Sequence, residues 1–190
     1  TVYRFYVTAA DSTDTFSAVF GNDQDPLHLS TPEGIYNSEL NSSWNASGIS
    51  SAVLSFFPEV LDDSFGTIGL DLGAELDGGE HPSLVQHDNM SPTVSQYFTQ
   101  GDTALTADDM IGIAWYLTGT NSGNGNYECC ISGFDTPTPN SLPVDGRWLI
   151  AQVTTTGDIS GRLNFQIFPF AVAFDQIQKS VEFDGCGTFY

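Results

Sequence analysis

The first candidates for chemistry are three side chains with oxygen atoms in one short segment. Asn22, Asp23 and Asp25 lie in the sequence GNDQDP at residues 21–26, a composition typical of a tight turn. Calcium prefers several hard oxygen ligands at about 2.4 Å, and alternating acidic residues in a loop can supply them. The segment lacks the glycine and the closing glutamate of a complete calcium-binding loop, so two interpretations stay open. Either these residues bind Ca2+, the one cofactor that the sequence predicts, or they form a solvated turn.

A second group of polar residues combines imidazole and carboxylate side chains, which together can bind a transition metal. Their spacing matches no known ligand motif, and Pro82 predicts an irregular backbone between them. We therefore favour an ordinary polar loop over a metal site. The group consists of Asp77, Glu80, His81, His87 and Asp88.

Motifs for catalysis are absent from the sequence. It has no G-x-S-x-G nucleophile elbow, no H-E-x-x-H metal motif and no glycine-rich phosphate loop. A glycosidase needs two carboxylates, a condition that a chain with 24 acidic residues always meets. We assign no catalytic residue and expect no enzymatic activity, with a hydrolase as the less favoured alternative.

Three aromatic residues lie in polar surroundings, where a ring could stack on a sugar. Trp44 falls in a segment rich in Ser and Asn, and Tyr36 and Tyr97 have similar neighbours. Tyr and Trp combine an apolar ring with a polar group, which suits carbohydrate binding. The alternative is that the three rings cover the edges of the core.

Three Asn-x-Ser sequons are candidates for glycosylation. They begin at Asn41, Asn45 and Asn89. Each falls in an expected loop, which is the right placement for an attached glycan. We expect a glycoprotein if the host has the machinery.

The three cysteines predict at most one intramolecular disulfide. Cys129 and Cys130 are adjacent and rarely bond to each other, since the resulting ring is strained. A bridge from one of them to Cys186 would tie the C-terminal end to a loop near residue 130 and leave one thiol over. The alternative is three reduced, buried cysteines.

The elements that must position these residues are short strands. Apolar residues alternate with period 2 nearly everywhere, and Gly, Asp, Asn or Pro residues bound the runs. We expect one all-β domain over residues 1–190, a jelly-roll-like sandwich of two sheets with long loops. A helical turn or two is expected over 170–179. The expected strands cover 2–9, 15–20, 52–57, 67–72, 110–117, 147–155, 163–167 and 181–183, and the long loops 21–50, 73–108 and 119–146.

The charge distribution narrows the range of partners. The chain has 4 basic and 24 acidic residues and a net charge of −20, and no Lys or Arg lies between Arg4 and Arg147. Nucleic acid and anionic lipid need a basic surface, so neither is an expected partner. No run of 18 or more apolar residues exists, so no membrane insertion is expected. A saline or calcium-bearing extracellular medium would relieve the self-repulsion.

The residues at both ends of the sequence are typical of β-strands. A strand is expected to begin at residue 2, and residues 187–190 end in two aromatic side chains. Such ends can pair with the sheet edge of a neighbouring copy, and a head-to-tail contact that repeats without closing builds a filament. The alternative is that both ends lie in their own sheets.

Five segments together resemble a known but uncharacterised β-rich domain of secreted and surface proteins of aquatic microorganisms. They are YRFYV at 3–7, FSAVFGND at 16–23, WLIAQVTT at 148–155, GRLNFQ at 161–166 and FDG at 183–185. The resemblance implies an extracellular location and a structural or adhesive role, and it carries over no catalytic residue. The cysteine pair is not part of the pattern.

These observations favour an extracellular structural protein, a subunit or repeat domain of a surface layer or fibre that assembles through strand edges or termini. Its expected partners are copies of itself. The alternative is a calcium- or carbohydrate-binding module, similar to an adhesin or a lectin, in a larger secreted protein that binds glycans.

Overall fold

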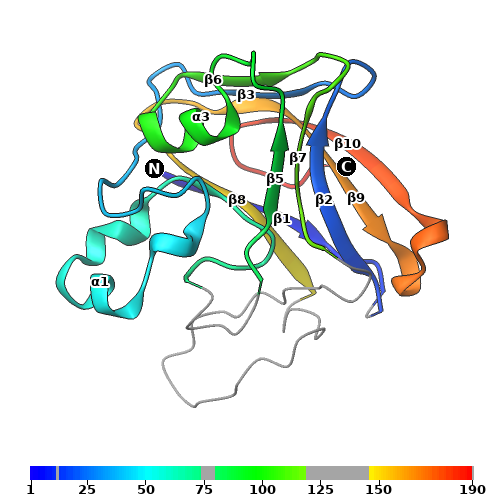
Figure 1. The fold of residues 1–190 in the computed structure, drawn as a ribbon, viewed down its shortest axis with the longest axis horizontal. Helices are drawn as coiled ribbons and strands as arrows, with labels where there is room; N and C mark the ends of the chain where they lie inside the picture. Colours follow the sequence, from blue (N-terminus) through cyan, green and yellow to red (C-terminus); the bar gives the residue numbers. More distant parts are fainter. Residues whose placement is uncertain (12, 74–79, 119–145, 190) are drawn as a thin grey trace.

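The predicted all-β sandwich of two sheets is confirmed (Figure 1). The computed structural model describes residues 1–11, 13–73, 80–118 and 146–189. Within them, two antiparallel sheets pack against each other, and no helix is long and apolar enough to cross a membrane. The strands are β1 (Val2–Thr8), β2 (Thr15–Gly21), β3 (Leu27–Ser30), β4 (Phe65–Gly66), β5 (Ser83–Gln86), β6 (Ala104–Ala107), β7 (Ile113–Tyr116), β8 (Arg147–Thr154), β9 (Ser160–Phe168) and β10 (Ile177–Asp184).

The smaller sheet has the strand order β1-β8-β4, and the larger sheet is organised around β9. One edge of β9 pairs with β10 along its whole length, from Ile177 opposite Ile167 to Asp184 opposite Ser160. The other edge pairs with β2 and then with β3. Among the described residues, β10 has no second partner strand and forms one outer edge of the larger sheet.

Strands β2 and β3 are two parts of one strand that a loop interrupts. Phe20 pairs with Asn164 and His28 pairs with Arg162, so the two parts follow one another along β9. Residues 22–26 leave the ladder between them. The loop therefore lies in the middle of the sheet rather than at its end.

Strands β7 and β6 are interrupted at the same place. Gly21 pairs with Ile113 and Leu27 pairs with Ala107, so residues 108–112 leave the ladder beside residues 22–26. The two loops touch closely: a Cβ atom on Gly112, whose φ is +67°, would lie 2.0 Å from the carbonyl oxygen of Gly21. At this point the sheet bends, and β3 and β6 lie across the top of the molecule while β2 and β7 run down its face (Figure 1).

The core lies between the sheets and is built on aromatic side chains. Trp115, Trp148 and Phe16 are almost completely buried, and the ring centroids of Phe16 and Trp148 lie 5.6 Å apart. Phe5 of β1 meets Phe183 of β10 edge to face at 4.9 Å. Inward-facing residues of the two sheets thus provide the interior. The predicted alternation does not extend to β8, where every residue from Trp148 to Val153 is buried, because a second apolar cluster covers its other face.

One expected strand is a helix. Residues 52–57 were expected to be extended, but α1 spans Ser51–Phe56. The hydroxyl of Ser50 accepts a hydrogen bond from the Val53 N–H and begins the helix as a side-chain cap. No residue of α1 is buried, so its apolar residues do not contribute to a sheet.

The expected loop 73–108 contains regular structure, namely β5, β6 and the helix α3 (Val94–Gln100). Thr93 and Gln96 form a capping box at the start of α3, a signal that the sequence contained. The expected helical turns after residue 170 are two short 3-10 turns, η3 (Pro169–Ala171) and η4 (Ala173–Asp175), and β10 begins at Ile177. The remaining turns are η1 (Ala46–Gly48) and η2 (Pro58–Asp62).

Both terminal strands lie in their own sheets. The N-terminal amine of Thr1 donates to the Thr155 carbonyl at 2.9 Å, and β1 pairs with β8 from Val2 to Thr8. Strand β10 pairs with β9, and Phe189 beyond it packs on Phe183 with 6.3 Å between ring centroids. Within one molecule the ends therefore follow the second alternative, and pairing of an end with a neighbouring copy stays a prediction.

Candidate functional site

The predicted calcium segment is a turn that its own side chains hold. The side-chain oxygen of Asn22 accepts hydrogen bonds from the N–H groups of Gln24 at 2.9 Å and Asp25 at 2.8 Å. The Asn22 N–H in turn donates to the Asp25 carbonyl at 3.0 Å. This is an Asx turn, and it uses the side-chain oxygen that Asn22 would offer to a cation.

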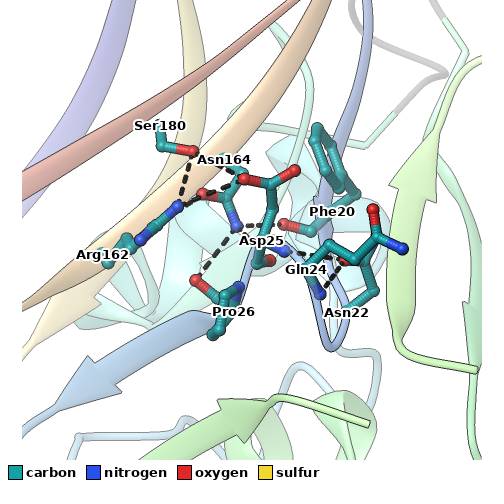
Figure 2. A network of polar contacts seen from close by, with 8 residues as sticks. All are labelled: Phe20, Asn22, Gln24, Asp25, Pro26, Arg162, Asn164 and Ser180. Carbon is teal, nitrogen blue, oxygen red and sulfur yellow. Dashed lines mark hydrogen bonds and ion pairs between the residues drawn. The ribbon is translucent and has the colours of Figure 1, made fainter. Parts of the chain in front are cut away.

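Asn164 of β9 fills the base of this loop (Figure 2). Its side-chain N–H2 group donates to the carbonyl oxygens of Phe20 at 3.1 Å, Asp25 at 2.8 Å and Pro26 at 3.1 Å. Asn164 is completely buried. The alternation of apolar and polar residues in the sequence placed Asn164 on the polar face of β9. Nothing in this alternation indicated that its side chain contacts three carbonyl groups about 140 residues away in the chain.

Arg162 completes the network with a positive charge (Figure 2). Its guanidinium lies 3.3 Å from the Asp25 carboxylate and 3.0 Å from the Ser180 hydroxyl, and it also donates to the side-chain oxygen of Asn164 at 3.3 Å. Asp23 is exposed and lies outside these bonds. In the described part of the chain, no group of three or more His, Cys, Asp or Glu residues is arranged to hold a metal ion. A calcium site at residues 22–25 stays a prediction.

A second polar unit joins the end of β5 to the loop 108–112. His87 Nδ1 lies 2.8 Å from a carboxylate oxygen of Asp109, and His87 Nε2 lies 3.3 Å from the side-chain nitrogen of Asn89. The other oxygen of Asp109 accepts from the N–H groups of Ile111 at 2.9 Å and Gly112 at 2.7 Å. These bonds, led by that from Gly112, hold the pKa of Asp109 below its usual value. The sequence singled out His87 but not Asp109.

The rest of the predicted imidazole and carboxylate group is dispersed. Glu80 accepts a hydrogen bond from the Thr118 hydroxyl at 2.7 Å, and Asp88 is exposed. Burial lowers the pKa of His81 and so favours its neutral form. Asp77 lies outside the described residues.

The three candidate sugar-binding rings have different environments. Tyr97 is completely buried in α3, so the prediction that it stacks on a sugar is wrong. Its hydroxyl lies 3.1 Å from that of Thr31, and burial raises the pKa of Tyr97 to about 12. Trp44 is half-buried and packs against the core and Gly66. Tyr36 alone of the three is exposed.

Two of the three sequons have a buried asparagine. The Asn41 side-chain nitrogen donates to the Asn45 carbonyl at 2.9 Å and to a carboxylate oxygen of Asp63 at 2.8 Å. Asn41, Asn45 and Asp63 are all buried. The Asn45 side chain accepts bonds from the Ser47 N–H and the Ser43 hydroxyl. Asn89 is exposed, so only this sequon offers its amide to solvent.

The disulfide prediction cannot be placed on the fold, because Cys129 and Cys130 lie outside the described residues. Cys186 follows β10 and is an exposed, free thiol.

All four basic residues of the chain lie on strands. Arg4 of β1 contacts Asp71 at 3.4 Å and the Gln152 side chain at 2.7 Å. The Arg147 guanidinium of β8 lies 4.4 Å above the centre of the Tyr6 ring. With Arg162 on β9 and Lys179 on β10, every fixed positive charge is attached to a sheet.

Two exposed apolar surfaces are the features that the sequence analysis missed most completely. The hairpin tip, residues 169–174 between β9 and β10, exposes Phe170 and Phe174. The α1 surface exposes Phe56, Phe57 and Leu61. Sequence periodicity could not separate these residues from core residues, because each is apolar and falls in an apolar run.

No protein-family model matches the chain, and no curated protein or solved structure is significantly similar to it. The geometry of the described residues therefore carries the functional argument.

Proposed function

We propose that this protein is an extracellular structural subunit that assembles with copies of itself into a fibre or a surface layer. The observation that carries the proposal is the β9–β10 hairpin. Within the part of the chain that the structure describes, β10 pairs on one side only, and six of its eight residues are exposed. Unpaired strand edges are surfaces on which other chains add.

The bonding of the polar groups supports a structural role. In the loop at residues 22–26, the polar side chains form hydrogen bonds and ion pairs within the protein, as Asn22, Asp25 and Asn164 show. The carboxylate of Asp109 likewise contacts His87 and accepts from a backbone N–H of its own loop. These side chains hold loops in place, which is the task of polar groups in a scaffold. The acidic composition and the resemblance to secreted domains support the extracellular location.

We expect the contact to use the exposed edge and tip of the hairpin, without exchange of a terminal strand between copies. Exchange of a terminal strand would first break the ladder between β1 and β8 or between β10 and β9. The hairpin needs no such opening, because its outer edge and its tip are already exposed.

The test is the size of the purified protein as salt is varied. We expect light scattering and negative-stain electron microscopy to show regular assemblies that form as salt screens the net charge of −20. A protein that stays monomeric at high concentration, across low and physiological salt and with or without calcium, would refute the proposal.

A further inference from the structure

The hairpin tip holds aromatic side chains in solvent. Phe174 is 99% exposed, Phe170 64% and Val172 40%. Phe170 and Ala171 have φ values of 54° and 57°, a left-handed conformation that residues with a Cβ rarely adopt. The Phe170 N–H is bonded to the Asp14 carboxylate at 3.3 Å. This bond ties the turn to the residue that precedes β2. The turn therefore holds a strained backbone conformation, and such conformations cluster at binding sites.

The α1 surface is apolar, exposed and firmly attached. Phe56 is 80% exposed, Phe57 46% and Leu61 45%. Below them, the buried side chain of Gln152 donates from Nε2 to the carbonyls of Leu61 at 2.8 Å and Asp63 at 2.7 Å. These bonds fix η2 to the middle of β8, so the apolar side chains are presented from a supported backbone.

The charges of the chain favour contact between these two surfaces. No titratable side chain lies between Glu39 and Glu59, or between Arg162 and Asp175. In a chain of net charge −20, two copies meet at such segments with the least repulsion.

The borders of the two surfaces are also complementary in part. Exposed Glu59 and Asp62 border the α1 surface. Lys179, the one lysine of the chain, lies on β10 near the hairpin tip and has no ion pair among the described residues. Asp175 and Asp14, whose carboxylate accepts the hydrogen bond of the Phe170 N–H, also border the tip. The complementarity therefore concerns the position of Lys179 alone, and not the net charge of the tip.

The two surfaces lie at opposite ends of the long axis of the molecule (Figure 1). We propose that the hairpin tip of one copy docks on the α1 surface of the next. This inference rests on the proposed self-assembly and names its contact. A contact between two different surfaces at opposite ends does not close on itself, so its repetition gives a filament with one direction.

The test uses two double variants of the full chain. F170S/F174S changes the tip, and F56S/F57S changes the α1 surface. Met110, which is 83% exposed and belongs to neither surface, provides the matched control M110S. Circular dichroism checks that each variant is folded.

We expect each double variant to remain monomeric under conditions in which the wild type and M110S assemble. An equimolar mixture of the two double variants should give dimers that do not grow, because each pair retains one intact tip and one intact α1 surface. Light scattering measures both results.

Other outcomes overturn the inference in distinct ways. If both double variants assemble like the wild type, the proposed contact between tip and α1 surface is wrong, but the proposed self-assembly is not contradicted. Loss of assembly in the tip variant alone would indicate a tip-to-tip contact. A wild type that never assembles refutes the proposed function as well, and binding of that monomer to phosphatidylcholine vesicles through Phe170 and Phe174 would assign the tip to lipid.

Discussion

The side-chain nitrogen of Asn164 lies 2.8 Å from the carbonyl oxygen of Asp25, at the point where two neighbouring strands leave the sheet together. Leaving the ladder frees backbone carbonyls that β9 would otherwise satisfy. Asn164 meets three of them from a completely buried position. One amide thus makes an interruption in the middle of a sheet tolerable, because buried carbonyls without a partner are costly.

Replacing this amide should destabilise the whole fold. We expect N164L to lower the free energy of unfolding by about 2–4 kcal/mol, since it leaves several buried carbonyls unsatisfied. Urea denaturation measures the change. The control Q166L alters a half-buried residue two positions further along β9 and should stay within about 0.5 kcal/mol of the wild type. Equal losses in both variants would show that the amide has no special role.

The buried Tyr97 predicts a loss of stability in alkali. Its pKa of about 12 in the folded protein exceeds the usual 10.0, so the unfolded chain loses this proton first. The stabilising contribution is therefore complete below about pH 10 and is lost as the pH rises towards 12, by about 1.4 kcal/mol per pH unit. Melting temperatures of wild type and Y97F should converge over that range, because Y97F lacks the titrating group. Parallel curves would contradict the assignment.

Asp109 should control the order of the loop 108–112. Its pKa lies below the usual 3.8 because the Gly112 N–H and His87 stabilise the carboxylate. Its contribution is present above about pH 3.8 and is lost as the pH falls through the lower, folded value. We expect D109A to increase hydrogen exchange at the Ile111 and Gly112 amides, measured by NMR. D108A, at the exposed neighbouring position, is the control and should leave these amides protected.

The net charge predicts that salt stabilises the monomer. Raising NaCl from about 10 mM to about 150 mM shortens the screening length from about 30 Å to about 8 Å and weakens repulsion among 24 acidic residues. The melting temperature should rise. If residues 22–25 also bind calcium, CaCl2 at matched ionic strength should add a further rise that D23N removes. Melting that is indifferent to salt and calcium would contradict both expectations.

Burial predicts which sequon carries a glycan. In a host that glycosylates secreted proteins, folded material should be modified at Asn89 only, because the Asn41 and Asn45 side chains are buried and bonded within the fold. Mass spectrometry of glycopeptides gives the occupancy at each position. N89Q should abolish modification, and a glycan on Asn41 in folded protein would contradict the placement of its side chain.

The alternation of apolar residues was sufficient to predict the sandwich, because side chains of period 2 must face one core. It failed at residues 52–57, where Ser50 caps a helix, and at residues 67–72, none of which lies in a strand. It also failed at Asn164, whose partners are neighbours only after β2, β3 and β9 have assembled. The contact between His87 and Asp109 could not be predicted for the same reason. A local pattern indicates which face of a strand a side chain occupies, but it does not indicate which distant side chains a bent sheet brings together.

The attachment of every fixed positive charge to a strand has a practical consequence. Trypsin cleaves after Lys and Arg and needs an extended, unpaired segment. Arg4, Arg147, Arg162 and Lys179 are the only such residues, and all lie in hydrogen-bonded strands. Cleavage therefore requires a strand to detach, so the rate at which trypsin digests this protein reports how often its sheets open.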